Sequence, residues 1–397
     1  MSSQFYDVII VGAGPAGSYA ACELASLGYT VAVLEQKTAP GLDVCCTGII
    51  STECLDSFDL SSEVILTKAS SAKFFSPSGK CLRLQSQKVQ AYVVDRASFD
   101  QAIADKARAR GANYFFSSRV TDIAIEKDRA QVETSHHGSR EILTARAVIL
   151  ANGFNPGLPQ KLGLGRIKKF LIGAQTEVET EIANEVEIYF GRRVAPGSFA
   201  WLVPVSANKA LVGLLSASQA KSHLQKFLLG PFYQGRVITT EAEIRQKAIP
   251  LGTLPRSYGD RVLVIGDAAG QVKATTGGGI YFGHLGAKIA VEVLKELLDT
   301  DDLTADKLSS YHRQWKAKMG SEISLGYRAR QVYARLSDRQ IDSIFSMLGS
   351  GGMAETLVNS PGFSFDWHSN LILKGLKYSL AHPLRKAWQL IPPGVAS

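Results

Sequence analysis

The sequence predicts an α/β protein organised around a parallel sheet that starts close to the first residue. Residues 7–11 (DVIIV) are a short apolar run of the kind that forms a fully buried strand. The glycine-rich run GAGPAG, residues 12–17, follows directly and opens a helical pattern. Residues 29–34 predict a second strand, which ends at Glu35. A strand, glycine turn, helix, strand and terminal acid in this order are typical of a Rossmann-type dinucleotide-binding unit.

The residues of this first motif have separate physical tasks. Gly12 allows the tight turn, Gly14 lets the backbone approach a pyrophosphate, and Gly17 lets the helix pack closely against the strand. The first helical turn, which contains Ala16, directs N–H groups and a positive dipole end at the phosphates. The carboxylate of Glu35 is expected to accept hydrogen bonds from the ribose hydroxyls of an ADP moiety.

A second motif follows another predicted buried strand at residues 261–265. Asp267, in a Gly-Asp pair, can accept a hydrogen bond from a ribityl hydroxyl. Three glycines that end at Gly279 then open a helix at Ile280. Such a helix N-terminus stabilises negative charge on a reduced flavin. The two motifs together predict FAD, with its ADP end at the first motif and its flavin end at the second.

The order of the predicted elements divides the chain into three parts. Residues 1–170 and 251–300 are expected to form a discontinuous FAD-binding domain, interrupted by a short substrate-domain hairpin near 73–94. Residues 171–250 show alternating patterns and predict an inserted antiparallel β substrate domain. Residues 301–397 predict a C-terminal helical region.

The stretch before the inserted domain predicts an antiparallel crossover. Residues 120–125, 131–135 and 141–143 are expected to form its three strands. Residues 147–150 are expected to return the chain to the parallel sheet as a separate strand.

Composition narrows the function classes. The 397 residues carry a formal net charge of +8 that no short stretch concentrates, so no nucleic-acid partner is expected. The basic excess suits anionic lipid, a phosphorylated substrate, an acidic redox partner or simply a basic enzyme. Five cysteines match no zinc-site spacing, so we expect no metal and reduced thiols, as in the cytoplasm. No signal peptide or membrane-spanning run is expected; peripheral membrane contact stays open.

Five stretches carry a family resemblance. They are GAGPAG with Glu35, CCTGIIS at 45–51, YVVDRASFD at 92–100, FAWLVP at 199–204 and GDAAGQVKATTGGGIY at 266–281. On these stretches the chain resembles the geranylgeranyl reductase family of FAD-dependent oxidoreductases, which has the p-hydroxybenzoate hydroxylase-type fold. The resemblance runs from Val8 to about Glu292 and covers the last hundred residues weakly or not at all.

The resemblance also implies cofactor contacts. Arg96, in the Asp-Arg pair, corresponds to an arginine near the ADP moiety, and Val120 corresponds to a backbone contact. Cys46, Thr47 and Gly48 correspond to a cysteine-centred loop that lies against the flavin.

Two residues are candidates for catalysis. Cys46 is expected to protonate the substrate or to order the water that does, because a thiol of ordinary pKa is mostly protonated at neutral pH. Trp201 lies in the substrate-domain signature, where Phe199 replaces the family's tyrosine and Val203 replaces an aromatic residue. The alternatives are that Cys46 is a packing residue and Trp201 is sheet core.

Two single residues and one segment each have two possible roles. Lys273, near the glycine turn, is expected to be a solvated charge rather than a residue that attracts a nicotinamide phosphate. His284 is expected to be a satisfied helix residue and not an acid. Residues 363–388 interleave aromatic and basic side chains, which suits either a membrane interface or a helical cap on the flavin domain.

The leading functional hypothesis is reduction of carbon–carbon double bonds in a polyprenyl lipid or polyprenyl diphosphate, by hydride from N5 of the reduced flavin plus a proton. The alternatives are an FAD-dependent monooxygenase on an apolar substrate and a redox-inert flavoprotein scaffold. No second Rossmann glycine motif for a nicotinamide nucleotide occurs, so the expected reductant is NADPH that docks transiently or a reduced ferredoxin-like donor. The sequence does not decide the oligomeric state.

Overall fold

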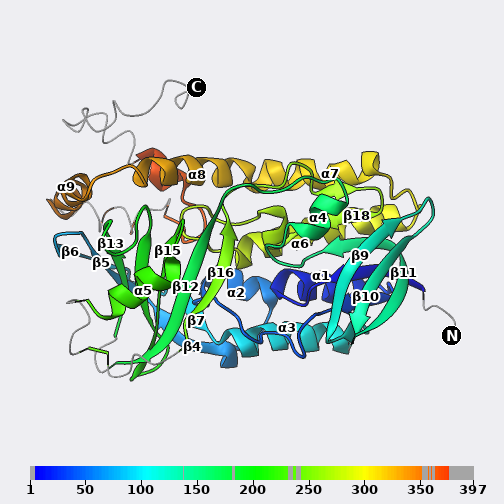
Figure 1. Ribbon diagram of the computed structural model, residues 1–397, viewed down its shortest axis with the longest axis horizontal. Helices are drawn as coiled ribbons and strands as arrows, with labels where there is room; N and C mark the ends of the chain where they lie inside the picture. The colour runs from blue at the N-terminus through cyan, green and yellow to red at the C-terminus, as the bar shows by residue number, and fades with distance from the viewer. Residues whose placement is uncertain are drawn as a thin grey trace.

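The computed structural model describes residues 5–136, 138–180, 184–230, 236–237, 243–350, 356, 359 and 363–374. Two large sheets lie toward opposite ends of its long axis, with α1 and β9–β11 on one side of Figure 1 and β12–β16 on the other.

The first sheet is the predicted parallel sheet. Its main strands, in spatial order, are β17 (Tyr258–Gly259), β18 (Val262–Val264), β11 (Ser139–Leu150), β1 (Phe5–Val11), β2 (Val31–Leu34) and β8 (Asn113–Phe115). All neighbours from β18 to β8 pair in parallel, and only β17 is antiparallel. The Rossmann-type arrangement expected from the sequence is therefore confirmed.

The antiparallel crossover differs from the prediction in one respect. β9 (Ser118–Ile125) and β10 (Ala130–His136) pair as expected. The predicted strands at 141–143 and 147–150 are instead one strand, β11, which pairs antiparallel with β10 and then parallel with β1. Thr144 has a partner in each, Gln131 and Phe5, so the separate-strand prediction is wrong. No glycine or proline interrupts the stretch between the two halves, so the strand continues.

Both faces of the parallel sheet are covered. Val8 and Ile10 face a core shared with α1 (Pro15–Ser26), α3 (Arg96–Ala109) and α6 (Ile280–Leu298). Ile9 and Val11 face a second core shared with the antiparallel layer and α4 (Gly157–Lys161). Because consecutive side chains of β1 are buried on opposite faces from Val8 onward, residues 8–11 form a continuous apolar run.

The second sheet has seven strands. In spatial order they are β16 (Arg245–Pro250), β12 (Phe170–Glu179), β15 (Lys209–Ser216), β14 (Phe199–Pro204), β13 (Val186–Phe190), β5 (Ser71–Phe75) and β6 (Cys81–Gln85). One face packs on α5 (Ala220–Leu228). The β5–β6 hairpin joins this sheet through β13, as the predicted hairpin requires.

The hairpin is shorter than expected. β7 (Ala91–Val94) leaves it and pairs with β3 (Ile49–Ser51) and β4 (Ile65–Ala69) in a separate three-stranded sheet. β7 leads directly into α3, and its Val93 and Val94 are buried near that helix, so β7 stays with the FAD-binding half. Two short helices, α2 (Thr52–Phe58) and a 3-10 turn at Ser62–Val64, lie between β3 and β4.

The chain ends in helices, as predicted, as far as the structure describes it. α7 (Ala305–Trp315), a π-helical turn at Lys316–Gly320 and α8 (Ser321–Tyr333) form a nearly continuous rod along one side of the molecule (Figure 1). α9 (Asp338–Gly349) follows. Among the described residues, none of the helices combines the length and apolarity needed to cross a bilayer.

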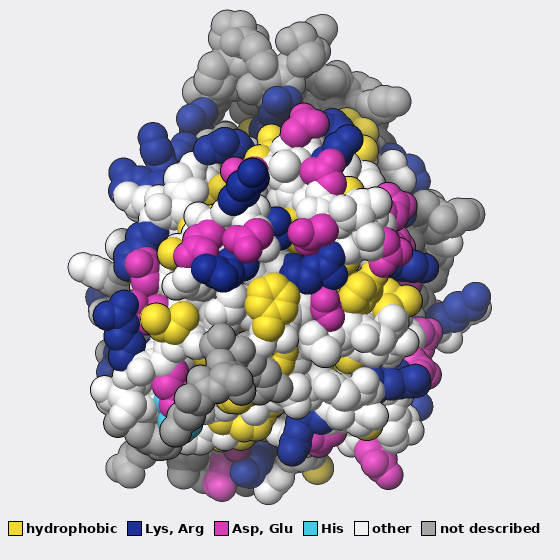
Figure 2. All heavy atoms as spheres, turned by 90° about the vertical axis from the view of Figure 1, so that its right-hand side faces the viewer, with side chains coloured by type: hydrophobic (Ala, Val, Ile, Leu, Met, Phe, Trp, Pro, Cys, Tyr) yellow, Lys and Arg dark blue, Asp and Glu magenta, His cyan; other side chains and the backbone are white. Residues whose placement is uncertain are grey.

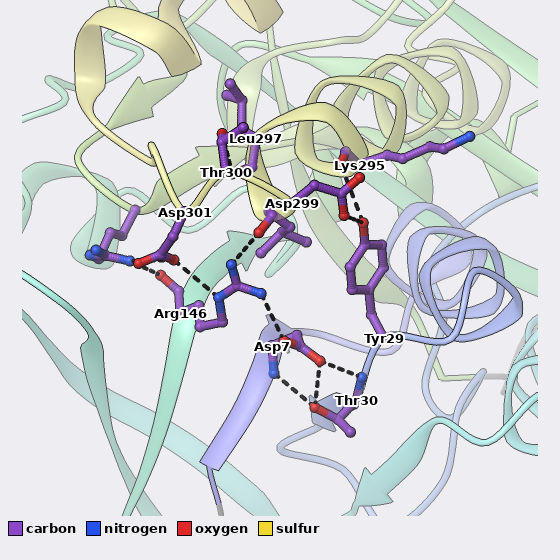
Figure 3. A network of polar contacts seen from close by, with 11 residues as sticks. Asp7, Tyr29, Thr30, Arg146, Lys295, Leu297, Asp299, Thr300 and Asp301 are labelled. Atoms are coloured by element: carbon purple, nitrogen blue, oxygen red, sulfur yellow. Dashed lines mark hydrogen bonds and ion pairs between the residues drawn. The ribbon is translucent and has the colours of Figure 1, made fainter.

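A polar network closes the end of the parallel sheet opposite the glycine turn (Figure 3). Arg146 of β11 donates to Asp7 of β1 at 3.1 Å and to Asp301 beyond α6 at 3.0 Å. Tyr29, before β2, donates to Asp299 at 3.0 Å. These bonds attach the C-terminal end of α6 to the sheet. The opposite end of the strands, where the glycine turn lies, remains for a site.

The basic excess is not gathered on the end face beside β9–β11. Figure 2 shows lysine and arginine side chains interspersed there with aspartate and glutamate.

Candidate active site

The two glycine motifs are about 250 residues apart in the sequence but lie close together in the structure. A Cβ built on Gly266 or on Gly283 would lie 3.5 Å from the Cβ of Ala16. Ala16 belongs to the first motif, Gly266 precedes Asp267, and Gly283 is in the first turn of α6. The N-termini of α1 and α6 therefore lie side by side, and a single extended ligand can reach both.

The first motif has the geometry that its glycines predict. A Cβ on Gly17 would lie 2.1 Å from the Gly12 carbonyl oxygen, so helix and strand pack too closely for any side chain. Gly12 has φ +105, and a Cβ there would lie 2.6 Å from the Ala151 carbonyl oxygen. A Cβ on Gly14 would have no neighbour within 4 Å. The space at Gly14 is where a pyrophosphate is expected.

Glu35 lies at the end of β2 and contacts this turn. Its two carboxylate oxygens accept hydrogen bonds from the backbone N–H groups of Ala13 (2.8 Å) and Lys37 (2.9 Å). An ionised carboxylate has about four acceptor positions, so capacity remains for ribose hydroxyls. Val120 lies nearby on β9, at a β-bulge and two residues after Ser118, whose N–H donates to the Glu35 carbonyl oxygen at 2.8 Å.

Asn152 was missed by the sequence analysis. It follows β11, and a Cβ on Gly12 would lie 3.1 Å from its Cα. Its side-chain oxygen and nitrogen are both buried, and neither has a partner within the described part of the chain. Buried amides are almost always hydrogen-bonded, so Asn152 is suited to contact a ligand. Its signal in the sequence is a polar residue at the carboxyl end of a parallel strand.

The Cys46 loop lies against the start of α3. Gly48 has φ +69, and a Cβ there would lie 2.3 Å from the Val94 carbonyl oxygen. The Cys46 sulfur accepts from the Gly48 N–H at 3.4 Å and interacts with the Arg96 guanidinium. Arg96 also forms a bidentate pair with Asp100 at 2.8 and 2.9 Å. Burial alone would lower the pKa of Arg96, but Asp100 and the Cys46 sulfur raise it above its ordinary value.

The same loop reaches the second sheet. The Gln175 side-chain amide of β12 donates to the Cys46 carbonyl oxygen at 3.2 Å. The Cys45 thiol donates to the Arg245 carbonyl oxygen of β16 at 3.6 Å. Burial, followed by the neighbouring Cys46, raises the pKa of Cys45 to about 11. Cys45 is therefore a protonated thiol that fastens the loop to the sheet, while Thr47 is half-buried between Cys46 and Gly48.

Asp267 is held between the loop before α6 and strand β16 of the second sheet. A Cβ on Gly279 would lie 2.5 Å from one Asp267 oxygen, so the glycine permits this close approach. The Lys247 ammonium of β16 lies 2.9 Å from the other oxygen, and the charge of Asp267 raises the pKa of Lys247. Lys247 was not identified from the sequence, because a lysine on an edge strand has the pattern of a solvated residue.

The expectation that Lys273 is solvated is wrong; this lysine lies in the loop before Ile280, the first residue of α6. Its side chain is 7% exposed and forms an ion pair with Asp366 at 2.6 Å. The aspartate comes from a segment far along the chain, which local sequence does not reveal. A residue of that segment, Trp367, packs against Phe282 at a ring distance of 5.3 Å. For residues 365–369 the structure therefore favours the cap over the membrane interface; residues 375–388 lie outside the described part.

One face of the second sheet is aromatic. Gln175, Gly213 and Trp201 are register partners on β12, β15 and β14, and a Cβ on Gly213 would lie 2.4 Å from the Trp201 ring. The indole therefore occupies the space that a side chain at Gly213 would fill, and its buried N–H has no partner among the described residues. Half-buried rings continue this face, with Phe199 6.0 Å from Trp201 and Phe190 6.2 Å from Phe199.

His284 is packed inside the helical layer. Its ring lies 4.2 Å from the Tyr19 ring and 4.6 Å from the Phe58 ring. Burial lowers its pKa to about 4, so it is a neutral core residue and not an acid. Its Nδ1 has no hydrogen-bond partner among the described residues, so the expectation that it is fully satisfied is wrong. No cluster with metal-binding composition occurs in the part of the chain that was described.

The fold and the paired glycine motifs define an FAD-dependent oxidoreductase of the Rossmann class. A family model described as pyridine nucleotide-disulphide oxidoreductase matches residues 6–185. A digeranylgeranylglycerophospholipid reductase of Methanocaldococcus jannaschii is 31% identical over 87% of this chain and 91% of its own length. Digeranylgeranylglycerophospholipid reductase 1 of Methanothermobacter thermautotrophicus is 33% identical over 85% of this chain and 89% of its own length. The chain belongs to the geranylgeranyl reductase family.

A solved structure agrees at the level of the fold. A geranylgeranyl bacteriochlorophyll reductase-like protein from Thermoplasma acidophilum has a TM-score of 0.84 at 22% identity, covering 98% of this chain and 100% of that one. This likeness spans the described C-terminal helices as well as the two sheets.

Proposed function

We propose that the protein reduces carbon–carbon double bonds in the polyprenyl chain of a geranylgeranyl-type lipid or diphosphate. The observation that carries the proposal is the aromatic face of the second sheet beside the Cys46 loop. Phe199 and Trp201 are half-buried there, as expected for side chains that await an apolar partner, whereas Phe190 at the far end already contacts the rings of Tyr333 and Phe345. The names of the relatives support the class of substrate.

The residues around the two glycine motifs fit FAD. The open space at Gly14, the acceptor capacity of Glu35 and the unpartnered amide of Asn152 suit the ADP and pyrophosphate end. Asp267 with Gly279, Ile280 and the Cys46–Gly48 turn suit the ribityl and flavin end. The flavin, when reduced, supplies a hydride. The division into an FAD-binding domain (1–170 and 251–300), a substrate domain (171–250) and a helical region (301–397) is part of this proposal.

Protonation of the alkene is assigned to the Cys46 loop. An isolated alkene resists hydride attack, so a proton has to arrive with the hydride, and water and oxygen have to be excluded. The carbonyl oxygen of Cys46 accepts a hydrogen bond from the Gln175 side chain of β12. Gln175 is in register with Gly213, which in turn pairs with Trp201, so the Cys46 loop lies next to the aromatic face of the sheet. Trp201, which lies next to Gly213 on this face of the sheet, excludes water from the reacting carbons. Asp267 and His284 have a weaker claim, because Asp267 is paired with Lys247 and His284 is buried among aromatic rings.

The reductant and the membrane contact belong to the same proposal. NADPH or a ferredoxin-like protein would reach the flavin transiently, since the sequence has one Rossmann glycine motif. Leu371 and Leu373 are 37% and 46% exposed in the short segment after Trp367. These two exposed leucines follow the packed part of the segment, and with the neighbouring Lys374 they suit a peripheral contact with a lipid surface.

The test is anaerobic turnover of the FAD-loaded protein with dithionite and a digeranylgeranyl glycerophospholipid. The expected product gains mass in steps of two hydrogens, read by mass spectrometry. A product that instead gains oxygen, and forms only in air, would identify a monooxygenase. A flavin that dithionite reduces without any change in the lipid would support the redox-inert scaffold.

A further inference from the structure

The glycine-rich loop that precedes α6 is closed by Lys273. The Lys273 N–H donates to the Gly278 carbonyl oxygen at 3.0 Å, and the Gly277 N–H donates to the Lys273 carbonyl oxygen at 2.8 Å. The lysine side chain then passes beneath the turn, since a Cβ on Gly278 would lie 2.9 Å from the Lys273 Cε. Gly278 is thus required by the path of a lysine.

That lysine ends on a residue from the C-terminal part of the chain. Its ammonium lies 2.6 Å from an Asp366 oxygen, and the two side chains are 7% and 3% exposed. It also lies 5.1 Å from the centre of the Phe365 ring. An ion pair this deeply buried leaves either charge without compensation if its partner is removed. The loop and residues 364–369 are therefore bound to one another.

Further contacts hold this segment on both sides. The hydroxyl of Thr275, in the loop, lies 2.7 Å from the Nδ1 atom of His368. Trp367 packs against Phe282 of α6. On the other side, the carboxylate of Glu322 in α8 accepts from the His368 N–H at 2.6 Å and from the Ser369 N–H at 3.0 Å. The segment is fixed to α8 and presses on the loop.

We infer that residues 364–369 form a strap that holds the glycine-rich loop in its flavin-binding form, with Lys273 and Asp366 as positioning residues. The inference rests on the proposed function only in assigning the flavin to this loop. The loop's last glycine, Gly279, is in close contact with Asp267, so a displaced loop would remove one of the surfaces that position this carboxylate. The C-terminal region is then part of the cofactor site, and a residue remote in sequence sets the affinity for FAD.

The test uses the full-length protein with three changes, Lys273→Met, Asp366→Asn and both together. Each single variant should bind FAD at least tenfold more weakly in a fluorescence titration. Hydrogen exchange at the Lys273 and Gly277 amides should accelerate by a similar factor. The double variant should lose less than the product of the two single losses, because no buried charge is left alone. Lys161→Met is the control: its ion pair with Asp122 is 59% and 55% exposed, so neither readout should change.

Unchanged FAD affinity and unchanged loop exchange in both single variants would overturn the strap. Losses that multiply in the double variant would also overturn it, since the two residues would then act separately. If Asp366→Asn does not fold, Thr275→Val removes only the hydrogen bond to His368 and should accelerate exchange at Gly277 in the same direction. A wild-type protein that binds no FAD would refute the proposed function, whereas the exchange rates would still support or refute the strap.

Discussion

Gly14 offers a direct test of where the pyrophosphate lies. A Cβ at Gly14 would meet nothing within 4 Å, and its φ of −73 and ψ of 177 suit any residue. Gly14→Ala should therefore leave the fold intact. Loss of an N-cap glycine costs a little helix stability and reduced unfolded-state entropy offsets it, so the net change should stay within about 1 kcal/mol.

FAD binding should respond much more strongly. If the pyrophosphate approaches the Gly14 backbone, the added methyl group displaces it and breaks at least one hydrogen bond to a charged group, worth about 1.5–3 kcal/mol. The dissociation constant should then rise about 10- to 150-fold. Equilibrium titration of the apoprotein with FAD measures this change, and thermal unfolding of the apoprotein measures the stability.

Gly349→Ala is the matched control. It also adds a Cβ with no neighbour within 4 Å, but in the last turn of α9. Its FAD affinity should equal that of the wild type. If Gly14→Ala binds FAD as tightly as this control, the pyrophosphate does not lie at Gly14 and the assignment of the first motif is wrong.

Three further outcomes follow. Cys46→Ala should slow alkene reduction by about 10²–10⁴-fold with FAD content and flavin reduction nearly unchanged, whereas Cys45→Ala should lose much less; an unchanged rate would make Cys46 a packing residue. Glu35→Ala and Asp267→Ala should each lower FAD occupancy of the purified protein, measured by absorbance. Because the pKa of buried His284 falls from 6.5 to about 4, its neutral form stabilises the fold fully above pH 6.5. That contribution, about 3 kcal/mol, is lost as the pH falls toward 4, so His284→Phe should reduce the loss of Tm between pH 7 and 4.5.

Local patterns in the sequence determined the cofactor-binding half. Residues 8–11, directly before Gly12, are all apolar because this part of β1 is buried on both faces. The glycines at 12 and 17 are required by contacts with near neighbours in the same strand–turn–helix unit or with the adjoining strand. Such constraints act over a few residues, so they leave a pattern that is visible without coordinates.

Pairing between distant segments was decided only by the tertiary structure. β7 was expected in the hairpin and joined another sheet, because an alternating pattern specifies a strand but not its partner. Lys273 was expected in solvent, Lys247 was not singled out, and Asn152 was not noticed. The sequence shows a charged or polar residue in each case, while its burial and its partner, Asp366 for Lys273 and Asp267 for Lys247, come from chain that folds back from elsewhere. The sequence therefore determined which chemistry is present, and the packing of the C-terminal segment and of β16 decided which charges pair beside the second glycine motif.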